Sequence, residues 1–264
     1  MKKEMKRERG NIMKKVIMCA LLFVFTPFVV SSSLAEDLPT YKDVGPALRK
    51  IVAEKNGGFG FHMWATIVDR DGVVRVVAFS GKDRGDQWPG SRLISAQKAN
   101  TANAFSLPGL ALSTANLYSA VQPGGSLYGL QHSNPVNTAV AYRGDSKLIG
   151  TKDDPMIGKK IGGVNVFGGG LPLYNSKGVL VGAIGLSGDS SYTDHIIAWK
   201  LRHALNLDYL PSGVSPTKDD NIVNDITNGV SASGWGHPTC SPEATQIASQ
   251  LPKTHPIRPI RVKK

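Results

Sequence analysis

Residues 64–79 read Trp-Ala-Thr-Ile-Val-Asp-Arg-Asp-Gly-Val-Val-Arg-Val-Val-Ala-Phe, two runs rich in β-branched side chains on either side of an Asp-Gly turn. β-branched residues favour strands, and Asp-Gly readily adopts the backbone angles that a tight hairpin turn needs. The stretch therefore predicts a β-hairpin.

Helical and extended patterns flank this hairpin. Tyr41, Val44, Leu48, Ile51 and Val52 recur at helical spacing, which predicts an amphipathic helix over 40–55. Further helices are predicted over 91–105, over 113–121 and from a Thr193 cap to about 207, and extended segments over 164–167, 171–174 and 179–186.

Composition and charge exclude several classes of protein. With 264 residues, 41% hydrophobic and 19% charged, the chain is too apolar to be disordered. The formal net charge is +11, but residues 1–35 and 253–264 each carry a net +5, which leaves +1 for residues 36–252. Nucleic-acid binding needs a clustered basic surface, so we predict no nucleic-acid partner.

Residues 1–35 have the order of a secretory signal peptide. A basic stretch ending at Lys15 precedes an apolar run over 16–30 and small residues over 31–35. The run is shorter than the about 20 residues that a membrane span needs. We therefore expect cleavage after Ala35 and a periplasmic or secreted protein with no stable membrane span; an uncleaved anchor is the alternative. The mature chain then keeps a single cysteine, Cys240.

Stretches rich in Gly, Pro and Asn indicate loops, which divide the mature chain into a domain, an insertion and a C-terminal arm. Residues 36–210 are predicted to form one domain, interrupted by an insertion at about 130–164. Residues 211–264 are polar and rich in Gly, Ser and Asn, which indicates an extended C-terminal arm with a basic tail rather than a second core.

Four blocks of residues, specific by their order and combination, together resemble the GlcG/HbpS-like haem-binding family. They are 84–105, which begins Arg84-Gly85-Asp86 and contains Pro89-Gly90-Ser91 and Lys98-Ala99-Asn100; Pro123-Gly124-Gly125 with Tyr128-Gly129; Gly168-Gly169-Gly170-Leu171-Pro172; and 181–188, Val-Gly-Ala-Ile-Gly-Leu-Ser-Gly, followed by Asp194.

This resemblance implies an α/β (α+β) fold of the profilin-like type, in which a central antiparallel sheet is flanked by helices, and it implies homo-oligomers. The predicted order of helices and strands agrees with that fold. The resemblance also implies haem or a related tetrapyrrole as the ligand, since some members bind haem and some degrade it. The insertion and the extension after Leu207 depart from the family pattern.

Haem requires an apolar slot, one or two axial ligands and a basic residue for its propionates. His62 is the first candidate ligand of the iron, because Trp64 lies beside it as a ring-contacting group. Arg84 and Lys98 are the candidate propionate-binding residues. A strand-end histidine that only forms hydrogen bonds is the alternative for His62.

His237 is the second candidate ligand, since glycines on both sides of Trp235 would let the arm fold over a bound ring. Docking of the arm through Trp235 is the alternative. Cys240 lies three residues after His237, but a structural zinc site needs four ligands and the sequence offers no second pair.

His195, Trp199 and His203 share one helical face, which fits a pocket or an oligomer interface. Taken together, the sequence predicts an exported protein that binds haem reversibly, in haem storage, sensing or degradation. An enzyme or accessory subunit acting on a small organic substrate, and a structural oligomeric protein, are the alternative functions.

Overall fold

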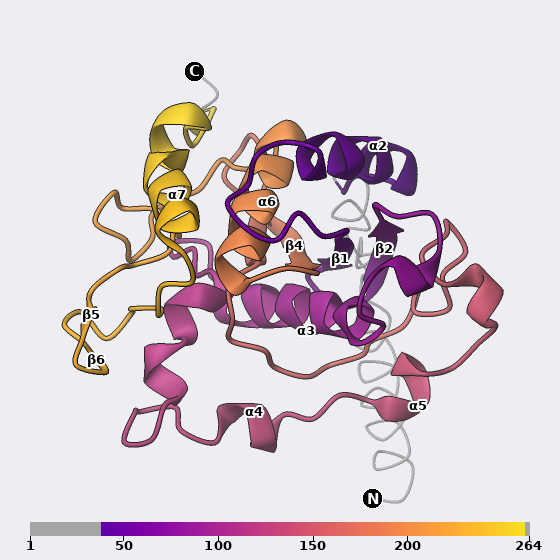
Figure 1. The fold of residues 1–264 in the computed structure, drawn as a ribbon, viewed down its shortest axis with the longest axis horizontal. Helices are drawn as coiled ribbons and strands as arrows, with labels where there is room; N and C mark the ends of the chain where they lie inside the picture. The colour runs from indigo at the N-terminus through magenta and orange to yellow at the C-terminus, as the bar shows by residue number, and fades with distance from the viewer. Residues whose placement is uncertain (1–37, 262–264) are drawn as a thin grey trace, which may run out of the picture. The chain divides into compact units, whose positions relative to one another are not determined.

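The computed structural model describes residues 38–261, and the predicted signal peptide at 1–35 lies outside this range. Four strands form one sheet in the order β2-β1-β4-β3, and each neighbouring pair is antiparallel (Figure 1). The strands are β1 (Trp64–Asp69), β2 (Val74–Phe79), β3 (Gly170–Tyr174) and β4 (Leu180–Ser187). The predicted hairpin is thus confirmed as β1 and β2.

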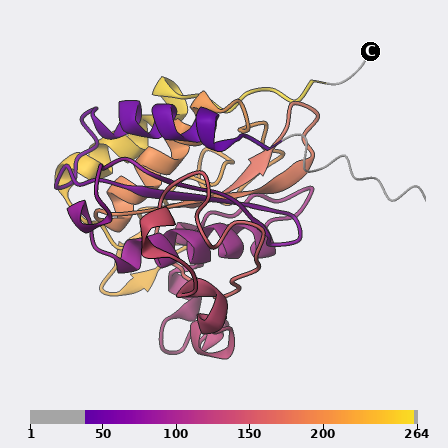
Figure 2. The ribbon, with the colours of Figure 1, turned by 90° about the vertical axis from the view of Figure 1, so that its right-hand side faces the viewer.

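Helices cover both faces of this sheet, as the edge-on view of Figure 2 shows. The longer helices are α2 (Tyr41–Val52), α3 (Gly90–Phe105), α6 (Ser191–Ala204) and α7 (Pro242–Thr254). The shorter elements are α4 (Leu130–Ser133), α5 (Thr138–Ala141), the 3-10 turns η2 (Arg84–Asp86), η3 (Thr114–Leu117), η4 (Ser119–Val121) and η5 (Ser146–Leu148), and the ribbon of β5 (Ile226–Thr227) and β6 (Val230–Ser231). None of the helices within residues 38–261 has the length and apolar character required to cross a membrane.

Alternation along β1 distributes its side chains between two core layers. Ala65 and Ile67 join the cluster formed with α2, α6 and α7, whereas Trp64 and Val68 join the cluster formed with α3. All six residues of β1 are buried as a result. The predicted α/β fold, a central antiparallel sheet flanked by helices, is confirmed.

Gly185 lets α3 lie directly on β4. A Cβ at this position would collide with the backbone of Ser95 and Ala99 on the helix. The small residues on this side of α3 and the glycine on the strand therefore permit a close helix–sheet contact.

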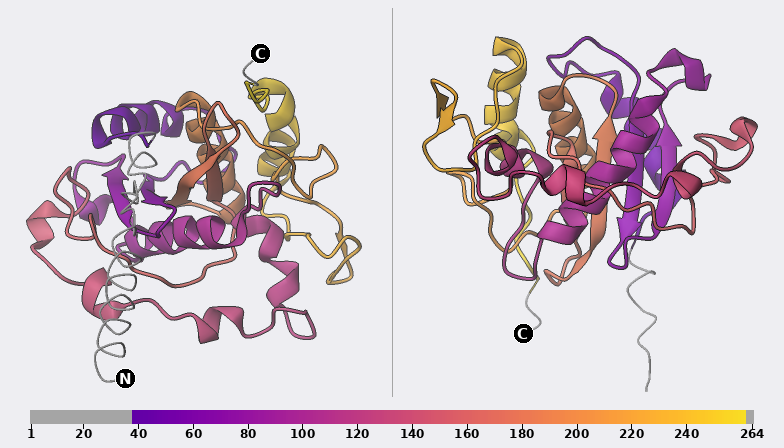
Figure 3. Two further views of the ribbon diagram at one scale, coloured as in Figure 1. Left: turned by 180° about the vertical axis from the view of Figure 1, so that it is seen from behind. Right: turned by 90° about the horizontal axis from the view of Figure 1, so that it is seen from below.

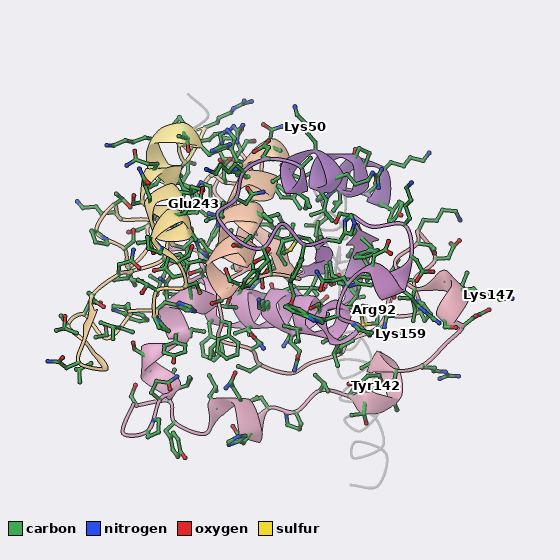
Figure 4. All side chains as sticks on the ribbon, viewed as in Figure 1. Lys50, Arg92, Tyr142, Lys147, Lys159 and Glu243 are labelled. Carbon is green, nitrogen blue, oxygen red and sulfur yellow. The ribbon has the colours of Figure 1, made fainter. Side chains whose placement is uncertain are left out.

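The insertion at 130–164 is anchored on the α3 layer. Met156 and Ile161 are buried in the same cluster as Trp64. Arg92 of α3, marked in Figure 4, pairs with Asp154 at 2.5 Å and donates a hydrogen bond to the carbonyl of Ala141 at 3.1 Å. The predicted insertion is therefore a cover that contains the short helical turns α4, α5 and η5.

Two local predictions are wrong. Residues 164–167 do not form a strand. The side chains of Val164 and Val166 are buried in a separate small cluster, and the N–H of Phe167 donates a hydrogen bond to the side chain of Asn165. Helix α6 is capped by Ser190 instead of Thr193, since the Ser190 Oγ accepts the N–H of Thr193 at 3.3 Å.

The C-terminal segment after Pro211 contains helix α7, where the sequence predicts extended chain. Ser241 caps this helix by accepting the N–H of Ala244 at 3.0 Å. Ala244, Ala248 and Leu251 follow at helical spacing and are buried in the core layer of α2 and α6. Figures 1 and 3 show α7 beside α6. The segment thus completes the existing core.

Candidate functional site

His62 lies just before β1 with its side chain exposed. Its Nδ1 is 3.2 Å from the Oγ of Ser80, and the same oxygen accepts the N–H of Met63 at 2.8 Å. The imidazole also meets the ring of Phe79 edge-on, with centroids 5.9 Å apart. No residue in 38–261 pairs with Nε2. One nitrogen is therefore held by the protein and the other is available, as in histidines that bind metals.

Three exposed aromatic side chains lie beside His62, and we call them the aromatic patch. Phe59, Phe61 and Trp88 are 71%, 41% and 54% exposed. Phe61 stacks on Phe59 and meets Trp88 edge-on, and each pair of centroids is 5.4 Å apart. Contiguous exposed apolar surface of this kind marks a binding site for a ligand or a partner.

Polar side chains hold the patch against the turn that follows β4. The Asp189 carboxylate accepts the N–H groups of Phe59 and Phe61 at 3.1 and 3.3 Å. The side-chain amide of Gln87 donates to the carbonyls of His62 and Gly188. The loop before β1 and the loop before α3 are therefore fixed to one common point.

Two grooves adjoin the patch. One, of about 330 Å³, is lined by Phe61 and by residues 85–89. The other, of about 230 Å³, is lined by the loop at 54–61, Asp189 and Glu243. Glu243, marked on α7 in Figure 4, pairs with Lys55 at 2.5 Å beside this groove.

The charges next to the patch are balanced. Asp86 accepts the N–H groups of Asp83 and Lys82 at 2.9 Å each, and these bonds lower the pKa of its carboxyl, with a smaller contribution from His62. Arg84 is exposed and donates one hydrogen bond to the carbonyl of Ser146 at 3.3 Å. Predicted residues His62 and Arg84 are thus brought to the same surface.

Trp64 is not part of this surface. Its side chain is 1% exposed and stacks on Phe79, with centroids 4.3 Å apart, inside the α3-side core. His62 precedes β1, so strand alternation does not relate its side chain to that of Trp64, the first residue of the strand, which faces the α3-side core. The predicted ring contact of Trp64 is not supported by this placement.

Lys98 is also in the interior, where it is 2% exposed. Its Nζ lies 2.7 Å from Oδ2 of Asp194, which joins α3 to the first turn of α6. Burial raises the pKa of Asp194 to about 6, although Lys98 opposes this rise. Gly169 leaves the space for the pair, because a Cβ there would approach both side chains. Lys98 is therefore occupied by a carboxylate and does not reach the patch.

His237 is 2% exposed beneath the C-terminal segment. Its Nδ1 is 2.8 Å from the carbonyl of Pro238, and its ring lies 5.0 Å from Tyr118 and 5.7 Å from Tyr192. Burial lowers its pKa to about 4, and its Nε2 has no partner in residues 38–261. No contact in that range joins it to His62. Within the same range, no cluster of His, Cys, Asp and Glu is placed to hold a metal ion.

The helical face of His195, Trp199 and His203 anchors the C-terminal segment. His195 Nε2 is 3.2 Å from Oδ1 of Asn221, and Trp199 donates to the carbonyl of His255 at 2.9 Å. His203 bonds to Asp208 at 2.7 Å, beside Arg258. This helical face is therefore covered by the C-terminal segment of the same chain and does not line an open pocket.

The aromatic patch was not predicted from the sequence. Phe59 and Phe61 alternate with Gly58 and Gly60 directly before His62, and Trp88 follows 26 positions later. The glycine–aromatic run next to a histidine was the available signal. The contact with Trp88 depends on tertiary structure.

Comparison with known proteins gives one family and several similar structures. A family model described as the haem degrading protein HbpS-like matches residues 37–201. No curated protein is similar to the chain at a significant level.

Among the solved structures that are similar to the chain are two crystal structures. The first is a crystal structure of the Klebsiella pneumoniae protein ORFY, of the family DUF336, at 25% identity over 66% of this chain and 89% of that one, with a TM-score of 0.43. The second is a crystal structure of a PduOC complex with haem, at 28% identity over 64% of this chain and 96% of that one, with a TM-score of 0.42.

Proposed function

Because the chain belongs to the HbpS-like family of haem degrading proteins, we propose that it binds haem reversibly on the aromatic patch, with Nε2 of His62 as an iron ligand. One observation carries the proposal: an exposed histidine, whose Nδ1 is held by Ser80 and whose Nε2 has no partner within residues 38–261, directly follows Phe61 of the aromatic patch in the chain.

The residues at this surface match the chemistry of the ligand. Haem is a planar, largely apolar ring, and Phe59, Phe61 and Trp88 offer it flat apolar contacts. Its two propionates need basic partners, for which the candidates are Arg84 and Lys82, both exposed in the loop that leads to Trp88. When bound, haem supplies the iron centre, and the protein supplies the imidazole, the apolar support and the charge.

His237 is the weaker of the two predicted ligands. Its ring is enclosed by Tyr118 and Tyr192, and haem would reach it only after the C-terminal segment had left the core. Because α7 contributes Leu251 to that core, removing the segment would destabilise the whole fold. Substitution of His237 is therefore a cleaner test than truncation after Pro211.

The test is a titration of the protein with haem followed by absorbance. His62→Ala is expected to weaken binding about ten-fold or more and to shift the Soret and visible bands, because the iron loses a ligand. His132→Ala, which removes another exposed histidine, is the matched control and leaves both unchanged. If His62→Ala binds haem with unchanged affinity and bands, the site is wrong; the absence of any Soret change in the unmodified protein overturns the function.

We also propose that the protein acts outside the cytoplasm, on the signal-peptide pattern of residues 1–35. Mass spectrometry of the native protein is expected to find a mature chain that starts at or near Glu36. A chain with an intact Met1 in the membrane fraction contradicts export with cleavage.

A further inference from the structure

Two rings of the aromatic patch lie on residues 58–61, which we call the aromatic loop. The stretch 57–61 reads Gly-Gly-Phe-Gly-Phe, and Gly57 and Gly60 have φ angles of +79° and +77°. Glycine loses more conformational freedom on ordering than any other residue. Phe59 and Phe61 are 71% and 41% exposed, so burial of their rings contributes little to the order of the loop. Its conformation therefore depends on polar contacts to the loop backbone.

Asp189 makes these polar contacts. Its Oδ1 accepts the N–H of Phe59 at 3.1 Å, and its Oδ2 accepts the N–H of Phe61 at 3.3 Å. Among residues 38–261, it is the one residue whose side chain bonds to the backbone of the aromatic loop. Each oxygen of the carboxylate thus holds one of the two phenylalanines.

Asp189 is itself fixed at the start of α6. Its N–H donates to Oδ1 of Asp194 at 2.9 Å, and its own Oδ1 also accepts the N–H of Ser190 at 2.6 Å. A negative charge at this end of a helix is favoured by the helix dipole. Gly58 lets the aromatic loop reach the carboxylate, because a Cβ at this position would collide with Oδ1 of Asp189.

We propose that Asp189 is a positioning residue for haem, whose carboxylate holds the aromatic loop so that Phe59 and Phe61 present their rings before the ligand arrives. This inference rests on the proposed haem-binding function. A ligand that binds one conformation of a loop loses affinity in proportion to the fraction of chains in that conformation. Asp189 therefore strengthens binding without contacting the iron.

The test compares Asp189→Ala and Asp189→Asn by amide hydrogen exchange of the haem-free protein and by haem titration. Alanine removes both acceptors, whereas asparagine keeps one carbonyl oxygen for Phe59 and turns an N–H₂ group toward the N–H of Phe61. We expect faster exchange at residues 59 and 61 with alanine and partial rescue with asparagine. Haem affinity should fall about ten-fold and about three-fold, respectively, if the loop keeps its binding conformation in those fractions of chains. The Soret and visible bands should stay in place, because His62 is kept.

Gly58→Ala displaces the loop while leaving Asp189 and its bond to Ser190 intact, so the same loss of affinity is expected if Asp189→Ala does not fold. Asp153→Ala and Gly109→Ala are the matched controls, since Asp153 is exposed on the insertion and a Cβ at Gly109 meets no atom within 4 Å. Both should bind haem as the unmodified protein does.

Three results would contradict the inference and leave the proposed function intact. They are unchanged exchange at residues 59 and 61 in Asp189→Ala, faster exchange with unchanged haem affinity, and a loss of affinity with shifted bands, which would place the effect at the iron. The absence of a Soret band in the unmodified protein overturns the function itself.

Discussion

Replacing Lys98 with Met tests whether this residue stabilises the fold or binds haem. The substitution keeps a long side chain and removes the ammonium group that lies 2.7 Å from the Asp194 carboxylate. Both side chains are 2–3% exposed, so the remaining carboxylate cannot recover its hydration. Removing one member of a buried ion pair costs about 3–5 kcal/mol where the remaining group has to stay charged.

The pH dependence of this loss identifies Asp194 as its source. Burial raises the pKa of Asp194 to about 6 with Lys98 present, and the pKa rises further without it. Above pH 6 the native variant then holds a proton that the unfolded chain has released, so its stability falls by about 1.4 kcal/mol per pH unit. We expect Lys98→Met to be destabilised by roughly 3 kcal/mol at pH 8, and by little near pH 6.

Urea unfolding followed by circular dichroism at pH 6, 7 and 8 measures this difference. The double variant Lys98→Met, Asp194→Leu removes both charges and is expected to lose the added pH dependence. Haem affinity of Lys98→Met at pH 6 should equal that of the unmodified protein. A loss of stability that is the same at all three pH values refutes the assignment to Asp194, and a weakened haem complex restores Lys98 as a propionate ligand.

Three further predictions concern the core. Leu251→Ala is expected to lower the free energy of unfolding by about 2–5 kcal/mol in urea, because α7 belongs to the main core; exposed Lys253→Ala is the control, and equal small losses contradict this role. Gly185→Ala should reduce the melting temperature by several degrees, because the added Cβ meets the backbone of α3; an unchanged melting temperature would show that α3 can shift. Burial lowers the pKa of His195 to about 3 and of His237 to about 4, so the unfolded chain binds protons first as the pH falls below about 6.5. Stability should therefore fall between pH 6.5 and 4, partly offset by the opposite shift of Asp194, and replacing both histidines with Gln should flatten this slope in urea titrations.

Local patterns in the sequence were sufficient for most elements of the sheet and its helices. The Asp-Gly turn and β-branched runs at 64–79 identify β1 and β2, and the apolar spacing at 40–55 identifies α2. The same kind of reasoning failed for α7, whose Ser241-Pro242 start was readable but whose few apolar residues are separated by polar ones. That helix is stable because Ala244, Ala248 and Leu251 on its buried face pack into the core.

The candidate site was only partly readable for the same reason. Of the residues predicted to bind haem, His62 and Arg84 are exposed, whereas Trp64, Lys98 and His237 are buried. Side-chain chemistry indicates what a residue can bind. It does not indicate which face of the sheet or which end of a helix the residue occupies.

By itself, then, the sequence predicted the β1–β2 hairpin and the helices α2, α3 and α6, because each depends on neighbours within a few residues. Tertiary structure alone decided that Lys98 meets Asp194, 96 positions away, and that Phe61 meets Trp88 beside His62. Such contacts form when the sheet brings α3 against β4 and the loops at its edge together. Packing in three dimensions decides which residues meet in such contacts. The spacing of the residues along the chain does not predict these pairs.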